Sequence, residues 1–132
     1  DSISTIPEAA ISACEALGRV DFLLLGGFDR GIDYQPLADY FKKHPLPYLL
    51  FTGKAGERMR KLMEETGALT NSMSFTYSSM EEAFSFISSH AKTGDVCLLS
   101  PAASSYDQYK NFEERGRKFK ALAELFKAGN AS

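Results

Sequence analysis

A cluster of serines follows an apolar run in the second half of the chain. Ser100, Ser104 and Ser105 lie in the segment 98–116, LLSPAASSYDQYKNFEERG, directly after the apolar residues of 95–99. Serine hydroxyls and free backbone amides can hold a carboxylate or another small anion. In an open α/β sheet, ligands bind at the carboxyl ends of the strands. The segment therefore predicts an anion-binding turn at a strand end.

Ser105 also has a purely structural interpretation. Ser105 and Gln108 have the spacing of a capping box, so the hydroxyl could simply cap the helix that follows. Both roles are compatible, because the free amides and the dipole of a helix start favour an anion. Asp107, Glu113 and Glu114 could suggest acid–base chemistry, but carboxylates at a helix start usually interact with the dipole or with water.

A glycine-rich turn carries the second candidate. The segment 26–31, GGFDRG, follows another apolar run, and glycines there let the backbone turn sharply. The guanidinium of Arg30 could clamp a carboxylate through two hydrogen bonds. The structural alternative is a tight turn with a solvated Asp29–Arg30 pair.

Two common phosphate-binding motifs are missing. The turn 26–31 lacks the G-x-G-x-x-G spacing of dinucleotide-binding folds, and the strand end 51–53 lacks the acidic residue that would hold a ribose. The chain also has no G-x-x-x-x-G-K-[ST] segment. Nothing in the sequence indicates that this chain alone holds the phosphates of ATP, and a nicotinamide-binding domain is disfavoured.

Length and composition predict a single domain of ordinary globular character. The chain has 132 residues and a net charge of −2, so no basic field favours nucleic acid or an anionic membrane. Its apolar runs are too short to span a bilayer, and its polar start lacks a basic signal region, so we expect a cytoplasmic protein. Cys14 and Cys97 are expected to be buried thiols, and the isolated His44 and His90 predict no metal site.

Helical and strand patterns alternate along the chain. Strands are expected at 21–27, 48–53, 74–77 and 95–99, with helices between and before them at 5–18, 35–43, 55–66 and 79–94. A last helix is expected from Asn111, because Phe112, Phe119, Leu122 and Phe126 would share one face. A fifth or sixth strand could lie in the weaker segments. This alternation predicts a Rossmann-like α/β domain of three layers, with a mostly parallel sheet and helices on both faces.

Two segments carry a resemblance to a known family. The segment 23–41, LLLGGFDRGIDYQPLADYF, and the segment 98–116 together resemble the C-terminal domain of the D-glutamate-adding Mur ligases. The opening DSISTIP is similar to the start of that domain, after the hinge from the central domain. The resemblance covers residues 1–132 and implies that the N-terminal domain and the central ATPase domain are absent from this chain.

The resemblance implies an ATP-dependent ligation in peptidoglycan synthesis. In that family, ATP phosphorylates the carboxylate of UDP-N-acetylmuramoyl-L-alanine, and the amine of D-glutamate attacks the acyl phosphate. The central domain mainly binds ATP and magnesium, so no cofactor is expected in this fragment, and it is not expected to be active alone. Its implied partners are the two substrates and its own central domain.

The resemblance also implies site residues. Arg30 and Ser105 match contacts to the side-chain carboxylate of D-glutamate, and Thr5 matches a threonine near the same ligand. The other implied positions are Phe112 through its backbone, the less certain Tyr106, and Asp1 at the nucleotide ribose. No catalytic residue and no metal ligand is implied.

The chain departs from the family pattern at a few positions. Ile3 stands where many members have a lysine near the nucleotide, which puts a phosphate contact in doubt. Arg30 stands where some members have lysine, and Ala103-Ser104 replaces the usual Cys-Ala. The alternative hypothesis is a non-catalytic α/β module that binds a small anion or a partner protein.

Overall fold

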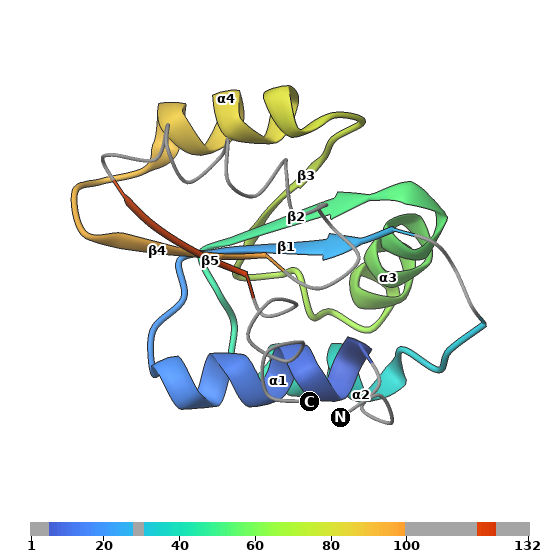
Figure 1. The fold of residues 1–132 in the computed structure, drawn as a ribbon. Helices are drawn as coiled ribbons and strands as arrows, with labels where there is room; N and C mark the ends of the chain where they lie inside the picture. Colours follow the sequence, from blue (N-terminus) through green and yellow to red (C-terminus); the bar gives the residue numbers. More distant parts are fainter. Residues whose placement is uncertain (1–5, 28–30, 100–118, 124–132) are drawn as a thin grey trace, which may run out of the picture.

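The sheet is entirely parallel in the part of the chain that the structure describes. The computed structural model describes residues 6–27, 31–99 and 119–123, the last for the backbone only. Within these ranges five strands pair in the order β3-β2-β1-β4-β5 (Figure 1). The strands are β1 (Phe22–Gly26), β2 (Tyr48–Thr52), β3 (Met73–Thr76), β4 (Asp95–Leu99) and β5 (Phe119–Ala123). The helices are α1 (Ile6–Leu17), α2 (Gln35–Lys43), α3 (Gly53–Glu65) and α4 (Met80–His90).

Helices cover both faces of the sheet, as the sequence predicted. Helix α4 lies on one side, and α1, α2 and α3 lie on the other (Figure 1). The central strand β1 is buried on both faces, because its side chains alternate between two cores. Leu23 and Leu25 pack with α1, α2 and α3, whereas Phe22 and Leu24 pack with α4. This is the three-layer α/β arrangement that the alternating pattern favours.

Local sequence signals predicted most helix ends to within a few residues of their positions in the structure. Helix α1 ends before Gly18, whose φ of 73° suits a residue without a side chain. At the start of α4, the hydroxyl of Ser79 accepts a hydrogen bond from the Glu82 amide at 3.3 Å. The Glu82 carboxylate accepts one from the Ser78 amide at 2.8 Å, so this capping box is confirmed with a shift of one residue. Helix α4 ends at His90, four residues before the expected Gly94.

The prediction of a last helix is wrong for residues 119–123. These residues form strand β5, which pairs in parallel with β4 from Asp95 opposite Phe119 to Leu99 opposite Ala123. The spacing of Phe119 and Leu122 fits a helix face, but five residues are too few for periodicity to separate a helix from a strand. Pairing with the free edge of β4 supplies backbone hydrogen bonds that local propensity does not reveal. Phe112 and Phe126 lie outside the described residues.

The two cysteines are buried free thiols, as predicted. Cys14 belongs to the core beneath α1, and Cys97 belongs to the core beneath α4. The sheet therefore separates them, and they have no route to a mutual disulfide. Burial also raises the pKa of the Cys97 thiol well above its usual range.

This raised pKa predicts a loss of stability at alkaline pH. In the unfolded chain Cys97 ionises above about pH 8.5, whereas in the folded chain it stays protonated. The free energy of unfolding should therefore be unaffected by this thiol below pH 8 and fall above pH 8.5, with a limiting slope of about 1.4 kcal/mol per pH unit. Urea unfolding at a series of pH values between 7 and 10 measures that slope.

The matched control is Cys97→Ala. It removes the ionising group and should reduce the slope between pH 8.5 and 9.5, whatever its effect on stability at pH 7. An equal slope in the variant and the parent chain would contradict the prediction. The buried Tyr77, whose pKa is also raised by burial, should add its own slope only above about pH 10 in both proteins.

Candidate functional site

The strand order reverses between β1 and β4. From β1 the chain proceeds outward through α2, β2, α3 and β3, and then returns through α4 to β4 on the other side of β1. Helices α2 and α3 cover one face of the sheet, and α4, which leads into β4, covers the other. Open α/β sheets bind ligands at such a reversal, at the carboxyl ends of the strands. The candidate site is therefore the carboxyl edge of β1 and β4.

The register of the two strands fixes the shape of that edge. Phe22 lies opposite Cys97, and Leu24 lies opposite Leu99, where β4 ends. Strand β1 extends two residues further, to Gly26, and pairs there with Thr52 of β2. The described part of β4 therefore stops at the level of Leu24, two residues short of the end of β1.

Two glycines permit a close approach of β1, β2 and α3 at this edge. Gly26 has a φ of 140°, and a Cβ atom built on it would lie 1.9 Å from the carbonyl oxygen of Thr52. Gly53, with a φ of 71°, would place a Cβ atom 2.5 Å from the carbonyl oxygen of Gly27. The Gly27 amide donates to the Thr52 carbonyl at 2.9 Å, and the Gly27 carbonyl accepts from the Ala55 amide at 3.2 Å. The GGFDRG turn thus begins tightly bound to the start of α3.

The other end of the β1–α2 connection is held by a residue that the sequence did not single out. The guanidinium of Arg58, in the second turn of α3, donates to the Ile32 carbonyl at 2.9 Å. It also lies over the ring of Tyr34, 4.7 Å from the ring centroid. Arg58 is surrounded by other charged residues in the sequence, so no local signal could have distinguished it from a solvated side chain.

The site residues implied by the family resemblance lie outside the described residues. They are Asp1, Thr5, Arg30, Ser105, Tyr106 and Phe112, together with Ile3 and the Asp29 partner of Arg30. The described strands nevertheless fix where two of their segments begin. The segment of Arg30 follows β1, and that of Ser105 follows β4, so both start at the same edge of the sheet.

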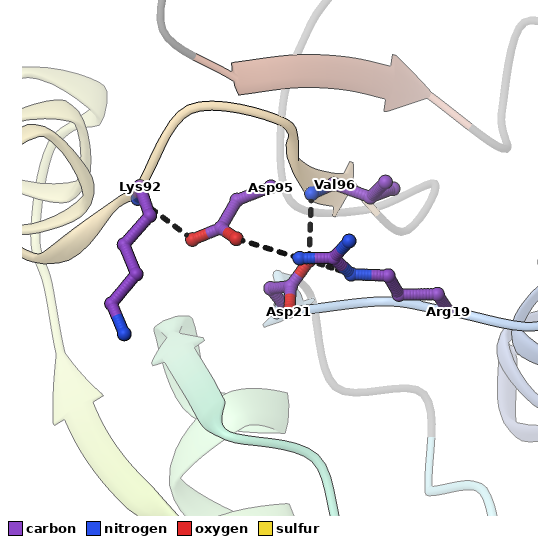
Figure 2. A network of polar contacts seen from close by, with 5 residues as sticks. All are labelled: Arg19, Asp21, Lys92, Asp95 and Val96. Atoms are coloured by element: carbon purple, nitrogen blue, oxygen red, sulfur yellow. Dashed lines mark hydrogen bonds and ion pairs between the residues drawn. The ribbon is translucent and has the colours of Figure 1, made fainter.

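A polar network occupies the opposite, amino edge of the same two strands (Figure 2). Arg19 donates from Nε to Asp21 Oδ2 at 3.0 Å and from Nη2 to Asp95 Oδ1 at 2.9 Å. The Val96 amide also donates to Asp21 Oδ2, at 2.8 Å, and the Lys92 amide donates to Asp95 Oδ2 at 2.9 Å. Both carboxylates are therefore bonded to a backbone amide and to the same guanidinium.

This amino-edge network has a structural explanation. Its carboxylates are already satisfied by neighbouring donors, and its hydrogen bonds join the start of β1 to the start of β4. The backbone of Asp21 adds a bond from its amide to the Val96 carbonyl and receives one from the Tyr48 amide of β2. We therefore assign it to strand registration rather than to ligand binding.

Other classes of site have little support in the described ranges. Within them, no group of three or more His, Cys, Asp or Glu side chains gathers where it could hold a metal ion. Among the helices of these same ranges, none combines the length and the apolar character needed to cross a bilayer.

Comparison with curated proteins gives one consistent result. The chain is 35% identical over 127 residues to the UDP-N-acetylmuramoylalanine–D-glutamate ligase of Clostridium tetani, covering 92% of this chain and 27% of that protein. The corresponding ligase of Vibrio campbellii is 38% identical, over 89% of this chain and 25% of the ligase. The chain is a relative of these ligases. A third ligase, from Limosilactobacillus reuteri, is 37% identical over 95% of this chain and 26% of its own length.

The extent of these matches agrees with one domain of a longer enzyme. The chain spans about a quarter of the length of the ligases it matches. The identity covers nearly the whole chain and confirms the resemblance to the D-glutamate-adding ligases, and it is consistent with their C-terminal domain. No family model matches the chain. No solved structure matches it either.

The close approach at the carboxyl edge predicts that Gly26→Ala is strongly destabilising. The new methyl group would overlap the Thr52 carbonyl, so β1 and β2 would have to separate at the site. We expect a loss of about 3 kcal/mol or more in the free energy of unfolding, measured with urea.

The control for this substitution is Gly18→Ala. Gly18 also has a positive φ, but no heavy atom lies within 4 Å of a Cβ built on it. It should lose only about 1–2 kcal/mol, the cost of the left-handed backbone conformation. Equal losses in the two variants would show that backbone conformation, rather than the contact with Thr52, accounts for the effect.

The amino-edge network predicts unequal effects of its two central side chains. Asp21→Ala leaves the Val96 amide without its carboxylate partner and should cost about 2 kcal/mol of unfolding free energy. Arg19→Ala removes an exposed guanidinium and should cost less than about 1 kcal/mol. Urea unfolding of both variants at pH 7 measures the difference, and a larger loss for Arg19→Ala would contradict the structural assignment.

Proposed function

We propose that this chain is the D-glutamate-binding, C-terminal domain of a UDP-N-acetylmuramoyl-L-alanine–D-glutamate ligase of peptidoglycan synthesis. The observation that carries the proposal is the sequence relationship to such ligases, which extends over about nine-tenths of the chain. The strand order supports it, because the segments of Arg30 and Ser105 begin at the two strands that flank the reversal point.

In this proposal the domain positions the nucleophile of the reaction. Arg30 and Ser105 bind the side-chain carboxylate of D-glutamate, a role suited to a guanidinium and a hydroxyl beside free amides. Thr5 lies near the same ligand, the backbone of Phe112 contacts it, and Tyr106 neighbours Ser105. Asp1 reaches the ribose of the nucleotide from this domain. None of these residues breaks or forms a covalent bond.

In this proposal, the other domains of the intact ligase carry out the bond-making and bond-breaking steps. The γ-phosphoryl group of ATP is transferred to the carboxylate of UDP-N-acetylmuramoyl-L-alanine, and ADP leaves. The amine of D-glutamate then attacks the acyl carbon, loses a proton, and displaces phosphate as the amide forms. ATP and magnesium would be held mainly by a central domain, which is the expected partner of this chain. Two free, buried cysteines suit the reducing cytoplasm in which we place it.

Substitution of the two proposed carboxylate contacts tests the site in the intact ligase. Arg30→Ala and Ser105→Ala should each raise the KM for D-glutamate by about 10- to 100-fold, since losing a hydrogen bond to a charged group costs about 1.5–3 kcal/mol. The measurement is phosphate release with ATP and UDP-N-acetylmuramoyl-L-alanine held at saturation.

Surface residues of the same types provide the controls. Arg60 pairs with Glu57 and Glu64 on the exposed side of α3, and Ser89 donates to the Ser85 carbonyl within α4. Arg60→Ala and Ser89→Ala should leave the KM for D-glutamate unchanged. All four variants should keep the parent KM for ATP. An unchanged KM for D-glutamate in both Arg30→Ala and Ser105→Ala would refute the site, and an intact protein without ligase activity would favour a non-catalytic binding module.

A further inference from the structure

Every sulfur atom of this chain belongs to a residue that the structure describes. The sequence has two cysteines and four methionines, and both cysteines are buried free thiols. Met59 and Met63 of α3 are fully buried in the core on their side of the sheet. Met80, at the start of α4, is partly buried against the other core. Met73 differs from all of these residues, because 49% of its surface is exposed.

The position of Met73 in the sheet explains this exposure. Met73 is the first residue of β3, which forms one edge of the sheet among the described strands. Its backbone amide donates to the Pro47 carbonyl at 2.9 Å, and the residue pairs with Tyr48 of β2. On its other side, β3 pairs with no described strand. The backbone of Met73 is therefore held in place, while small solutes can reach the residue.

An accessible thioether reacts with peroxides, and a buried one is protected by the fold. In this reaction the O–O bond of the peroxide breaks, the sulfur gives up two electrons, and one peroxide oxygen becomes the sulfoxide oxygen. Hydrogen peroxide leaves as water, and an alkyl hydroperoxide leaves as an alcohol. Exposed thiolates would compete for the oxidant, but both cysteines are buried, and burial raises the pKa of the Cys97 thiol.

We propose that Met73 is a reversible oxidation site, at which a peroxide forms methionine sulfoxide on the folded protein. Reversal takes two electrons and two protons from a thiol-dependent methionine sulfoxide reductase. The sulfoxide oxygen then leaves as water, and a disulfide forms in the reductase. Exposure serves both directions, because the oxidant and the reductase must each reach the sulfur without unfolding the sheet.

The surroundings of Met73 accommodate a sulfoxide. The polar S=O group would stay in water, since Met73 belongs to neither core cluster of the described residues. The bond to Pro47 involves only backbone atoms, so oxidation of the side chain leaves it intact. Met73 also lies level with Tyr48, four residues or about 13 Å of strand from Thr52 at the carboxyl edge. Oxidation should therefore leave the fold and the candidate site unchanged.

Peroxide treatment of the intact protein tests the inference. Dilute hydrogen peroxide is added at pH 7, and peptide mass spectrometry follows a gain of about 16 Da at each methionine, with and without urea. Met73 should react in the folded protein within about threefold of its rate in urea. Met59 and Met63 should react at least about 100-fold more slowly than in urea, because they are exposed only on unfolding. Each residue thus serves as its own reference for intrinsic reactivity.

Two leucine variants assign the reactive sulfur. Met73→Leu keeps an apolar side chain without sulfur, and Met80→Leu is the matched control at a partly buried methionine. Only Met73→Leu should remove the fast oxidation. In the parent protein, mild oxidation should change Tm by less than about 3 °C, as for a change at an exposed side chain. A methionine sulfoxide reductase should then restore the original mass without urea.

Several outcomes would overturn the inference. They are a Met73 that is protected in the folded protein as strongly as Met59, a fall in Tm larger than about 3 °C after mild oxidation, and a sulfoxide that the reductase removes only in urea. Fast oxidation that persists in Met73→Leu would also refute the assignment. None of these measurements uses ligase activity, so this inference and the proposed function can fail independently.

Discussion

The placement of β1 between β2 and β4 is the constraint on which the rest of the structure depends. Its side chains enter both cores, and its backbone pairs with a strand on either side. At its start, the backbone of Asp21 donates to Val96 of β4 and accepts from Tyr48 of β2. Because all the strands are parallel, fixing this start also fixes the opposite edge. The reversal of strand order, and with it the candidate site, follows from which neighbours β1 has.

The two edges of the sheet are held together by different kinds of group. At the amino edge, the carboxylates of Asp21 and Asp95 bond to the Arg19 guanidinium, and Asp21 also accepts from a backbone amide of β4. These bonds hold the starts of β1 and β4 in register. At the carboxyl edge, the glycines at the ends of β1 and β2 bring backbones close together. These contacts tie the start of the segment after β1 to β2 and to the first turn of α3.

Helix α3 contacts the connection between β1 and α2 at two places. Buried Ala55 and Met59 anchor it to the sheet, its first turn bonds to Gly27, and Arg58 reaches Ile32 and Tyr34. The helix therefore contacts the described residues at both ends of the connection between β1 and α2.

The sequence alone determined the local structure and the family relationship. Alternating apolar segments, the Ser79–Glu82 capping box and Gly18 predicted most elements, because short-range sterics and hydrogen bonds act within a few residues. The motif segments after β1 and β4 identified the ligase relationship, which the curated relatives confirm. Tertiary structure decided what depends on distant partners. Residues 119–123 became a strand because β4 offered a free edge, and Arg58 gained its contacts because folding brought Ile32 and Tyr34 to it. Neither partner is near in sequence, so no local pattern could have revealed them.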